Sequence, residues 1–258
     1  MFPRISRLFS KRRMDLLKAR ANPQLAFRKD TEDIRKNDWE ASSTPKALKQ
    51  RWVEITGPGN DAKMIINDMN SQADGYMLDL EDSMAPTPSN VLQAHENIRQ
   101  LVRGTLSAQT ASKSYELTPD PVPTFMVRVR GLHMDHDATL FDVCEFLEHN
   151  GRALYESGRG PYLYIPKLET YEEALFMNAL LQECEERIGL PENAVKVTVL
   201  IETFPAIFQT DEIVHALKGR LVGLNFGRWD YLFSMMKCLP NVAFPDRATL
   251  GMQLPHME

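Results

Sequence analysis

Charged side chains follow five short apolar runs of the sequence, and their types could support chemistry on a charged substrate. In an α/β protein with parallel strands, functional residues lie where strands end and pass into the following loops. The charged residues at these five ends are Asp79, Glu81 and Asp82; Arg128 and Arg130; Lys167; Glu202; and Asp230. Because neighbouring strands lie about 4.8 Å apart, we expect these groups to converge on one rim.

Glu202 and Asp230 follow consecutive apolar runs, and two carboxylates at one edge suit a hard divalent cation. Magnesium usually takes one or two protein carboxylates, keeps several waters and leaves room for an oxygen-rich substrate. Arg128 on a neighbouring strand would face that substrate, where a cation and a rigid guanidinium stabilise an anion or a developing enolate. The pattern predicts a metal site for a carboxylate substrate or for an enolising carbonyl compound.

Each of these residues also has an ordinary structural explanation. A lone acid after a strand is usually a helix cap or a solvated loop residue, and Asp230 would suit the start of a helix. Lys167 could be a surface lysine, and Arg130 an outward-facing ion-pair partner. His133 and His136 are spaced like a metal pair, but the loop around them offers no further ligands. The prediction therefore depends on the agreement of all five strand ends.

The apolar runs alternate with amphipathic segments, as in parallel strands joined by helical crossovers. The expected strands cover 52–55, 76–80, 124–129, 162–165, 195–201 and 221–224. The expected helices cover 61–70, 90–102, 140–155, 171–188 and 211–217, and the polar segment 104–123 suits a hairpin insertion. Neither G-x-G-x-x-G nor G-x-x-x-x-G-K-[ST] occurs, so nucleotide-binding folds are disfavoured. The pattern favours an α/β fold of the (β/α)₈ TIM-barrel type, incomplete, with about six of its eight strands.

Composition and charge exclude several classes of protein. The 258 residues carry a formal net charge of −5, whereas nucleic-acid binders are usually basic. The sequence has no apolar stretch of about 18 residues, no secretory leader pattern and no close spacing among its three cysteines. We therefore expect neither nucleic-acid nor membrane partners, and no secretion.

The first part of the chain differs in character from the rest. Residues 1–50 are polar and helix-forming, and we expect an N-terminal helical extension there. Residues 51–258 would then form the partial barrel that carries the metal and substrate site. The basic start, with Ser6 and Ser10, is similar to an organelle transit peptide, but the helical pattern that continues over 14–20 favours a solvated basic helix.

Several blocks of sequence, in order, resemble malate synthase of the shorter, A-type form. The resemblance extends over roughly residues 10–258, so it does not depend on one short motif. The most specific block reads Gly-Leu-Asn-Phe-Gly-Arg-Trp-Asp-Tyr-Leu-Phe-Ser at 223–234, and an acidic loop reads Asp-Leu-Glu-Asp-Ser-Met-Ala-Pro at 79–86. The other blocks lie at 53–58, 128–133, 160–169 and 200–203.

The resemblance implies a (β/α)₈ barrel that condenses glyoxylate with acetyl-CoA and water, giving malate and CoA, with Mg²⁺ as cofactor. It assigns the magnesium ligands to Glu202 and Asp230, and stabilisation of the enolate to Arg128 as a catalytic residue. It places Asp79 and Glu81 near the waters of the metal. The residues that it assigns to glyoxylate are Arg128, Gly227, Arg228, Trp229 and Asp230.

The resemblance also implies that part of the family's chain lies outside these residues. Family members are considerably longer, and their catalytic base is an aspartate in a later helical region that nothing here matches. We therefore expect a chain that is truncated before its base and lacks the last two barrel strands, with little turnover alone and an exposed sheet edge.

Two other functions stay open at this point. One is a citryl- or malyl-CoA lyase or an HpcH-type metal aldolase on a related scaffold, and the other is a non-catalytic remnant that binds a ligand or partner. The expected partners are the small molecules glyoxylate and acetyl-CoA. The expected location is the cytoplasm for a bacterial source and the peroxisome or glyoxysome for a eukaryotic one, and the sequence predicts no oligomeric state.

Overall fold

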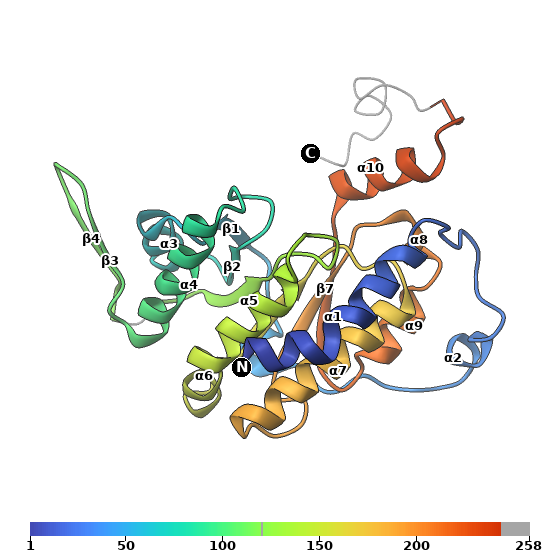
Figure 1. The fold of residues 1–258 in the computed structure, drawn as a ribbon. Helices are drawn as coiled ribbons and strands as arrows, with labels where there is room; N and C mark the ends of the chain where they lie inside the picture. The colour runs from blue at the N-terminus through green and yellow to red at the C-terminus, as the bar shows by residue number, and fades with distance from the viewer. Residues whose placement is uncertain (120, 244–258) are drawn as a thin grey trace.

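A computed structural model describes residues 1–119 and 121–243, and a parallel sheet of six strands forms its centre (Figure 1). The strands are β1 (Glu54–Pro58), β2 (Gly75–Asp79), β5 (Thr124–Arg128), β6 (Tyr162–Ile165), β7 (Lys196–Ile201) and β8 (Leu221–Phe226). Their order in the sheet, β1-β2-β5-β6-β7-β8, is their order in the chain. A doubly wound sheet would reverse its order at a switch point. The unbroken order is that of a TIM barrel, and within the described residues no pairing joins β8 to β1, so the incomplete barrel-type fold is confirmed.

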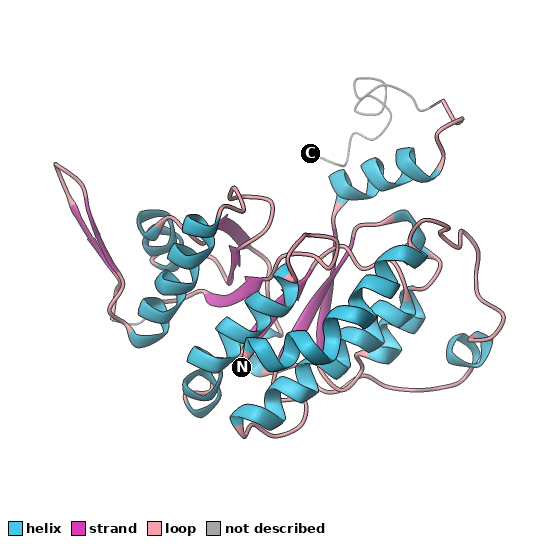
Figure 2. Cartoon of the chain, in the orientation of Figure 1, coloured by secondary structure: helices cyan, strands magenta, loops and turns pink. Residues whose placement is uncertain are grey.

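Helices fill the crossovers between these strands (Figure 2). They are α3 (Ala62–Met69), α4 (Pro88–Arg103), α5 (Ala138–Phe146), α6 (Arg152–Glu156), α7 (Tyr171–Ile188), α8 (Phe204–Ile207) and α9 (Thr210–Ala216), and α10 (Arg228–Cys238) follows β8. Among the helices of the described ranges, none has the length and apolar character needed to cross a membrane.

Local signals in the sequence explain where several helices begin and end. Asp61, Thr87 and Thr170 precede α3, α4 and α7, and each side chain accepts a hydrogen bond from a backbone N–H of the first turn. Such caps stabilise a helix by about 1 kcal/mol each. Gly104 and Gly189 end α4 and α7 with a φ of 68°, a left-handed conformation that glycine adopts without a steric penalty.

Some elements differ from the sequence prediction in detail. β1 begins at Glu54 rather than at Trp52, whose side chain is exposed. The helix expected over 140–155 contains a π-helical turn at Leu147–Gly151, which separates α5 from α6. The expected hairpin insertion is present, and in Figure 2 it projects from the body of the molecule. Its strands are β3 (Ser107–Gln109) and β4 (Ser114–Glu116), which pair antiparallel.

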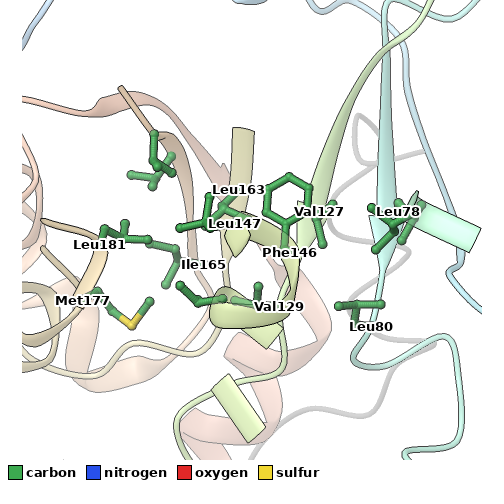
Figure 3. Packing of buried hydrophobic residues seen from close by; sticks show 14 of the residues in the cluster. Leu78, Leu80, Val127, Val129, Phe146, Leu147, Leu163, Ile165, Met177 and Leu181 are labelled. Carbon is green, nitrogen blue, oxygen red and sulfur yellow. The ribbon is translucent and has the colours of Figure 1, made fainter. Parts of the chain in front are cut away.

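Two apolar clusters cover the two faces of the sheet. The larger one lies between the sheet and the helices, where Val127 and Leu163 pack against Phe146 and Leu147 (Figure 3). A smaller cluster covers the other face, and its buried members are Leu48, Met126, Tyr162, Tyr164 and Leu200. Side chains alternate between the faces of a strand, so the second cluster marks the face that becomes the interior of a barrel.

The N-terminal segment packs along the helical layer. It contains α1 (Phe2–Ala19), α2 (Glu32–Lys36) and a 3₁₀ turn at Lys46–Leu48. The predicted helix at the start is present, but it is not fully solvated, because Ile5 and Phe9 are buried against the core and α1 contacts α5 and α7. One apolar stripe among basic residues is sufficient to hold such a helix on the body of the protein.

Candidate functional site

An ion pair lies at the centre of the rim formed by the carboxyl ends of the strands. Arg128 donates two hydrogen bonds to Asp79, from Nε to Oδ1 at 2.7 Å and from Nη2 to Oδ2 at 2.6 Å. Both side chains are buried. Two parallel charge-assisted bonds fix the guanidinium in a single orientation.

Strand register explains why these two residues meet. Asp79 and Arg128 are direct partners in the ladder between β2 and β5. Leu78 and Val127 precede them and belong to the cluster under the helices, so alternation places the charged pair on the opposite, inner face. Leu200 belongs to the inner cluster, and Glu202 comes two residues later, so the same alternation places Glu202 on the inner face as well.

Asp79 also fixes the acidic loop that follows β2. Its carboxylate accepts hydrogen bonds from the backbone N–H of Glu81 and of Ser83, both at 2.8 Å. Burial alone would raise the pKa of Asp79, but the ion pair with Arg128 and these hydrogen bonds hold it below its usual value. Asp79 therefore stays charged and positions both the arginine and the loop.

Lys167, just after β6, places its ammonium among four carboxylates. Its Nζ lies 2.9 Å from Glu81 Oε2, 2.9 Å from Asp82 Oδ2, 3.3 Å from Asp230 Oδ2 and 4.0 Å from Glu202 Oε1. The side chain is only 15% exposed, so the surface-lysine interpretation is wrong. Burial lowers the pKa of this amine, but the surrounding acids raise it well above its usual value, and the group stays an ammonium.

Hydrogen bonds on both sides hold the backbone of Lys167. Its N–H donates to Glu202 Oε1 at 2.9 Å, and its carbonyl accepts from Arg20 Nη2 at 2.8 Å. Lys167 has a φ of 54°, which costs energy for a residue with a side chain. Arg20 also pairs with the buried carboxylate of Glu173, so α1 anchors this part of the rim.

Glu81 and Glu202 are buried acids that bind protons unusually tightly. Burial raises the pKa of Glu81 to about 6 and that of Glu202 to about 7, although Lys167 lowers both. Asp230 raises the value of Glu202 further. The rim thus holds more carboxylates than its ammonium and guanidinium groups can fully compensate, which is the condition under which a further cation binds favourably.

The strand end of β8 and the first turn of α10 complete the rim. Asp230 lies in that first turn with a 35% exposed side chain and points its carboxylate at Lys167. Gly227 is the N-cap residue, and no side-chain cap bond is present at this helix start, so Asp230 does not act as the cap considered from the sequence. A Cβ on Gly227 would lie 2.5 Å from Glu202 Oε2, so only glycine leaves room for that carboxylate.

The donor set fits a hard divalent cation. Glu202 and Asp230 present carboxylate oxygens from consecutive strand ends, and Glu81 and Asp82 lie on the other side of the same ammonium. Carboxylate oxygens and water are the ligands that Mg²⁺ prefers. Lys167 Nζ already lies among these four carboxylates, so their negative charge favours a cation at this point.

A second acidic cluster lies on α5 and the π-helical turn, away from this rim. The ligand-type atoms of Glu145, Glu148 and His149 lie within 4.8 Å of one another. Glu148 binds the amino group of Met1 at 2.7 Å, and Glu145 lies 3.7 Å from Arg99. These side chains are 22–39% exposed, and both acids are already paired with cationic groups. Glu148 therefore serves as a reference for the acids of the rim.

Arg130 and the nearby histidines do not join the carboxylate cluster. Arg130 binds both oxygens of Asp142, which is fully buried and also contacts His95. Arg130 is thus an ion-pair partner, as one interpretation expected, but it is buried rather than outward-facing. His133 and His136 share no ligand group in the described chain, and burial together with nearby cations lowers the pKa of His133 to about 4.

A cavity of about 730 Å³ opens beside the rim. It lies between the start of α4 and the loop after β5, and the same loop carries Gly131, whose N–H bonds to Glu81 Oε1 at 3.2 Å. Its lining is mainly apolar and also contains an arginine, two histidines and an aspartate. The residues that define it include Pro86, Leu92, Met134, Phe141, Arg130 and His133.

The predicted glyoxylate-binding residues Gly227, Arg228 and Trp229 lie at the N-terminus of α10. The N-terminus of a helix binds anions favourably, because its backbone N–H groups point outward and its dipole is positive there. The guanidinium of Arg228 lies over the ring of Trp229, 4.6 Å from its centroid. The structure thus brings this turn next to Asp230 and Glu202.

Sequence reasoning underrated one contribution to the rim and missed another. It treated Lys167 as a weak candidate, although its position at a strand end was a usable signal. It also missed Arg13 on α1 and Arg20 directly after it, which bind backbone carbonyls of Leu132 and of Lys167, respectively. Nothing in the local sequence indicates contacts between α1 and loops so distant in the chain.

Comparisons with known proteins identify the family of this chain. The family model for the malate synthase TIM-barrel domain matches residues 124–258. Malate synthase A of Escherichia coli is 41% identical over 245 residues, which cover 90% of this chain and 46% of that protein. Malate synthase of Myxococcus xanthus is 39% identical over 96% of this chain and 50% of its own length. Glyoxysomal malate synthase of Candida tropicalis is 37% identical over 98% of this chain and 50% of its own. The chain spans about half the length of these relatives, and it belongs to the malate synthase family.

Proposed function

We propose that this chain carries the cation- and glyoxylate-binding part of a malate synthase, which condenses glyoxylate with acetyl-CoA and water to give malate and CoA. The observation that supports it best is the single rim on which a fixed guanidinium meets a cluster of carboxylates. In this proposal, Arg128 stabilises the negative charge that develops on the substrate, and Glu202 and Asp230 hold the cation. The names of the relatives agree with this activity.

Arg128 has one nitrogen available for an oxygen of the substrate. Nε and Nη2 bind Asp79, whereas Nη1 faces Asp82 at 3.3 Å and Glu81 at 3.8 Å. Asp82 is half exposed and can move aside. In the proposed reaction, Nη1 donates to the oxygen that gains negative charge when the methyl group of acetyl-CoA loses a proton. A donor that is fixed beforehand stabilises that charge without reorganisation.

Glu202 and Asp230 would hold Mg²⁺, with Asp79 and Glu81 close to its waters. When bound, the ion supplies Lewis-acid polarisation of the glyoxylate oxygens. The chain itself orients glyoxylate, because the first turn of α10 presents Gly227, Arg228 and Trp229 to a carboxylate.

The cavity beside the rim offers a place for the thioester arm of acetyl-CoA. Its apolar wall suits the methylene groups of such an arm, and Arg130 and His133 lie at its edge. We propose no catalytic base among residues 1–258, because none of them matches the aspartate that serves as the base in the family. We therefore predict that these residues bind the cation and glyoxylate but turn over little on their own.

Calorimetric titration tests this function directly. We expect glyoxylate to bind residues 1–258 only in the presence of Mg²⁺, and Glu202→Gln to abolish both events. The matched control is Glu148→Gln, which removes an acid from the second cluster on α5 and should change neither titration. A folded sample without magnesium-dependent glyoxylate binding would contradict the proposal.

A lyase or aldolase on the same scaffold is the alternative function, and a thioester assay separates the two. Cleavage of a preformed malyl-CoA or citryl-CoA without added glyoxylate would support the alternative. For location, we propose the cytoplasm for a bacterial source and the glyoxysome or peroxisome for a eukaryotic one, as in the name of the Candida relative. Fractionation of source cells tests that assignment.

A further inference from the structure

One ammonium group, that of Lys167, balances most of the negative charge of the four acids around it. Lys167 Nζ is within 3.3 Å of Glu81, Asp82 and Asp230, and 4.0 Å from Glu202. The nearest other cation, Arg128, gives two of its nitrogens to Asp79. Without Lys167, the buried Glu81 and Glu202 and the more exposed Asp82 and Asp230 would repel one another, and this repulsion would spread the rim apart.

The backbone around Lys167 commits the side chain to this position. Its N–H binds Glu202 and its carbonyl binds Arg20, while its φ of 54° directs the side chain differently from the extended strand before it. A left-handed conformation in a residue with a side chain persists only where the surroundings hold it. One of the two anchors belongs to the site itself, because it is the predicted metal ligand Glu202.

We propose that the Lys167 ammonium is a built-in occupant of the cation site, which holds the four acids together until a divalent cation displaces it. This inference rests on the proposed function, because it takes Glu202 and Asp230 as the ligands of the cation. When the cation binds, Lys167 gives up these two acids and keeps Asp82, which lies at the exposed side of the cluster. A divalent ion can displace a single positive charge, whereas a monovalent ion gains little by doing so. Lys167 thus sets both the affinity and the charge selectivity of the site.

If Lys167 only shaped the site, its removal should weaken cation binding, whereas the proposal predicts the opposite. Removal of the charge should tighten cation binding, because the cation no longer competes with an internal one. At the separations seen here, we expect Lys167→Met to bind Mg²⁺ at least about tenfold more tightly than the wild-type chain. The metal-free form of the variant should melt at a lower temperature, and Mg²⁺ should restore the melting temperature.

Two further variants serve as controls. Lys167→Arg keeps the charge and should keep the weaker, wild-type-like affinity. Lys196→Met removes another partly buried lysine, which lies at the start of β7 and bonds to Ser42 Oγ and to the carbonyl of Gly219 rather than to an acid of the rim. Its Mg²⁺ affinity should be unchanged.

The experiment is calorimetric titration of Mg²⁺ at about pH 8 into all four chains, with folding checked by near-ultraviolet circular dichroism. A tighter Lys167→Met supports the proposal, and an unchanged or weaker affinity overturns it while the proposed function stands. If no chain binds Mg²⁺, the proposed function and this inference both fail.

The wild-type chain offers a second measurement that does not depend on a variant folding. Amine acetylation followed by mass spectrometry reports how accessible Lys167 is. We expect acetylation of Lys167 to rise several-fold when Mg²⁺ is added, with Lys196 unchanged as the internal reference. Equal acetylation with and without Mg²⁺, in a chain that calorimetry shows to bind the ion, would overturn the displacement.

Discussion

The two sides of the rim are built differently. On the side of β2 and β5, Asp79 and Arg128 are buried and joined by two short hydrogen bonds. On the side of β7 and β8, Glu202 is buried, but Asp230 is 35% exposed and α10 contains no buried residue. Leu224 and Phe226 of β8 are also exposed.

The neighbours of each strand explain this difference. β2 and β5 have a paired strand on both sides, whereas within the described residues β8 pairs only with β7. The group proposed to stabilise an anion is therefore fixed by contacts inside the described chain. The groups on the cation-binding side are held mainly by Lys167 and by side chains that are partly exposed to solvent. The exposed sheet edge expected from the sequence is found on this side.

Asparagine substitutions should show the largest difference in stability between the two sides of the rim. Asp79→Asn removes the charge from a buried carboxylate that accepts four hydrogen bonds, and it leaves Arg128 with only the more distant Asp82 and Glu81 as counter-charges. We expect the free energy of unfolding to fall by about 3–5 kcal/mol. Chemical denaturation measures this loss.

The matched substitution on the other side is Asp230→Asn. Its partner Lys167 keeps two nearer acids, so we expect a loss below about 1 kcal/mol. Similar losses for the two variants would show that the sides of the rim are equally fixed, contrary to the comparison.

The pH dependence of stability reports the acids around Lys167. Glu81 and Glu202 have folded-state pKa values of about 6 and about 7, above the usual 4.5, so the folded chain binds their protons more tightly than the unfolded chain does. This stabilisation is complete below the unfolded value and is lost as the pH rises through the folded values. Between about pH 5 and pH 8, these two acids lower the free energy of unfolding without metal by about 4 kcal/mol. His133, with its pKa lowered to about 4, acts in the opposite direction over the same range. Because this side chain is partly exposed to solvent, which weakens its effect, it offsets at most about half of the fall, so we expect a net fall of at least about 2 kcal/mol.

Glu202→Gln serves as the control for this slope. Glutamine keeps an oxygen that can accept the N–H of Lys167 but cannot titrate, so at least about half of the slope should disappear. An unchanged slope in the variant would mean that other groups cause the pH dependence.

Much of the inner side of the rim could be predicted from the sequence because alternation and strand ends are local properties. Asp79, Arg128 and Glu202 each follow an apolar run, and the parity of the residues before them fixes the face on which they lie. The order of six strands followed from the same alternation of strands and helices. The sequence alone therefore predicts the position of the charged groups along each strand.

The contacts of longer side chains could not be predicted in the same way. Lys167 reaches the acids from a left-handed backbone whose carbonyl is bound by Arg20, the residue after α1, which is far away in the chain. Arg130 has the parity of a rim residue but turns to Asp142 on α5. A flexible side chain at a strand end has several charged partners within reach, and only the packing of the helices decides among them.

A methyl group at Gly227 should disturb the cation-binding side selectively. Its φ of −86° is ordinary, so alanine causes no backbone strain there, but its Cβ would collide with the carboxylate of Glu202. We expect Gly227→Ala to weaken Mg²⁺ binding by roughly tenfold or more. A loss of folding stability should accompany it, because the new Cβ would also lie 2.6 Å from the Cβ of the buried Glu202. Calorimetry measures the affinity, and Gly158→Ala, where no atom lies within 4 Å of a Cβ, controls for the loss of a glycine but carries its own strain at a φ of 70°. An unchanged affinity in Gly227→Ala would argue against Glu202 as a ligand in its present position.

The smallest effect is expected at the exposed side of α10. Phe233 is 68% exposed, so Phe233→Ser should change the free energy of unfolding by no more than about 0.5 kcal/mol. The buried Phe146 under the sheet provides the contrast, since Phe146→Ala should cost about 3–5 kcal/mol. Denaturation at two protein concentrations sharpens the test. A loss well above 1 kcal/mol that grows with concentration would show that Phe233 is covered by a second copy in solution, and the two sides of the rim would then differ less than the single chain indicates.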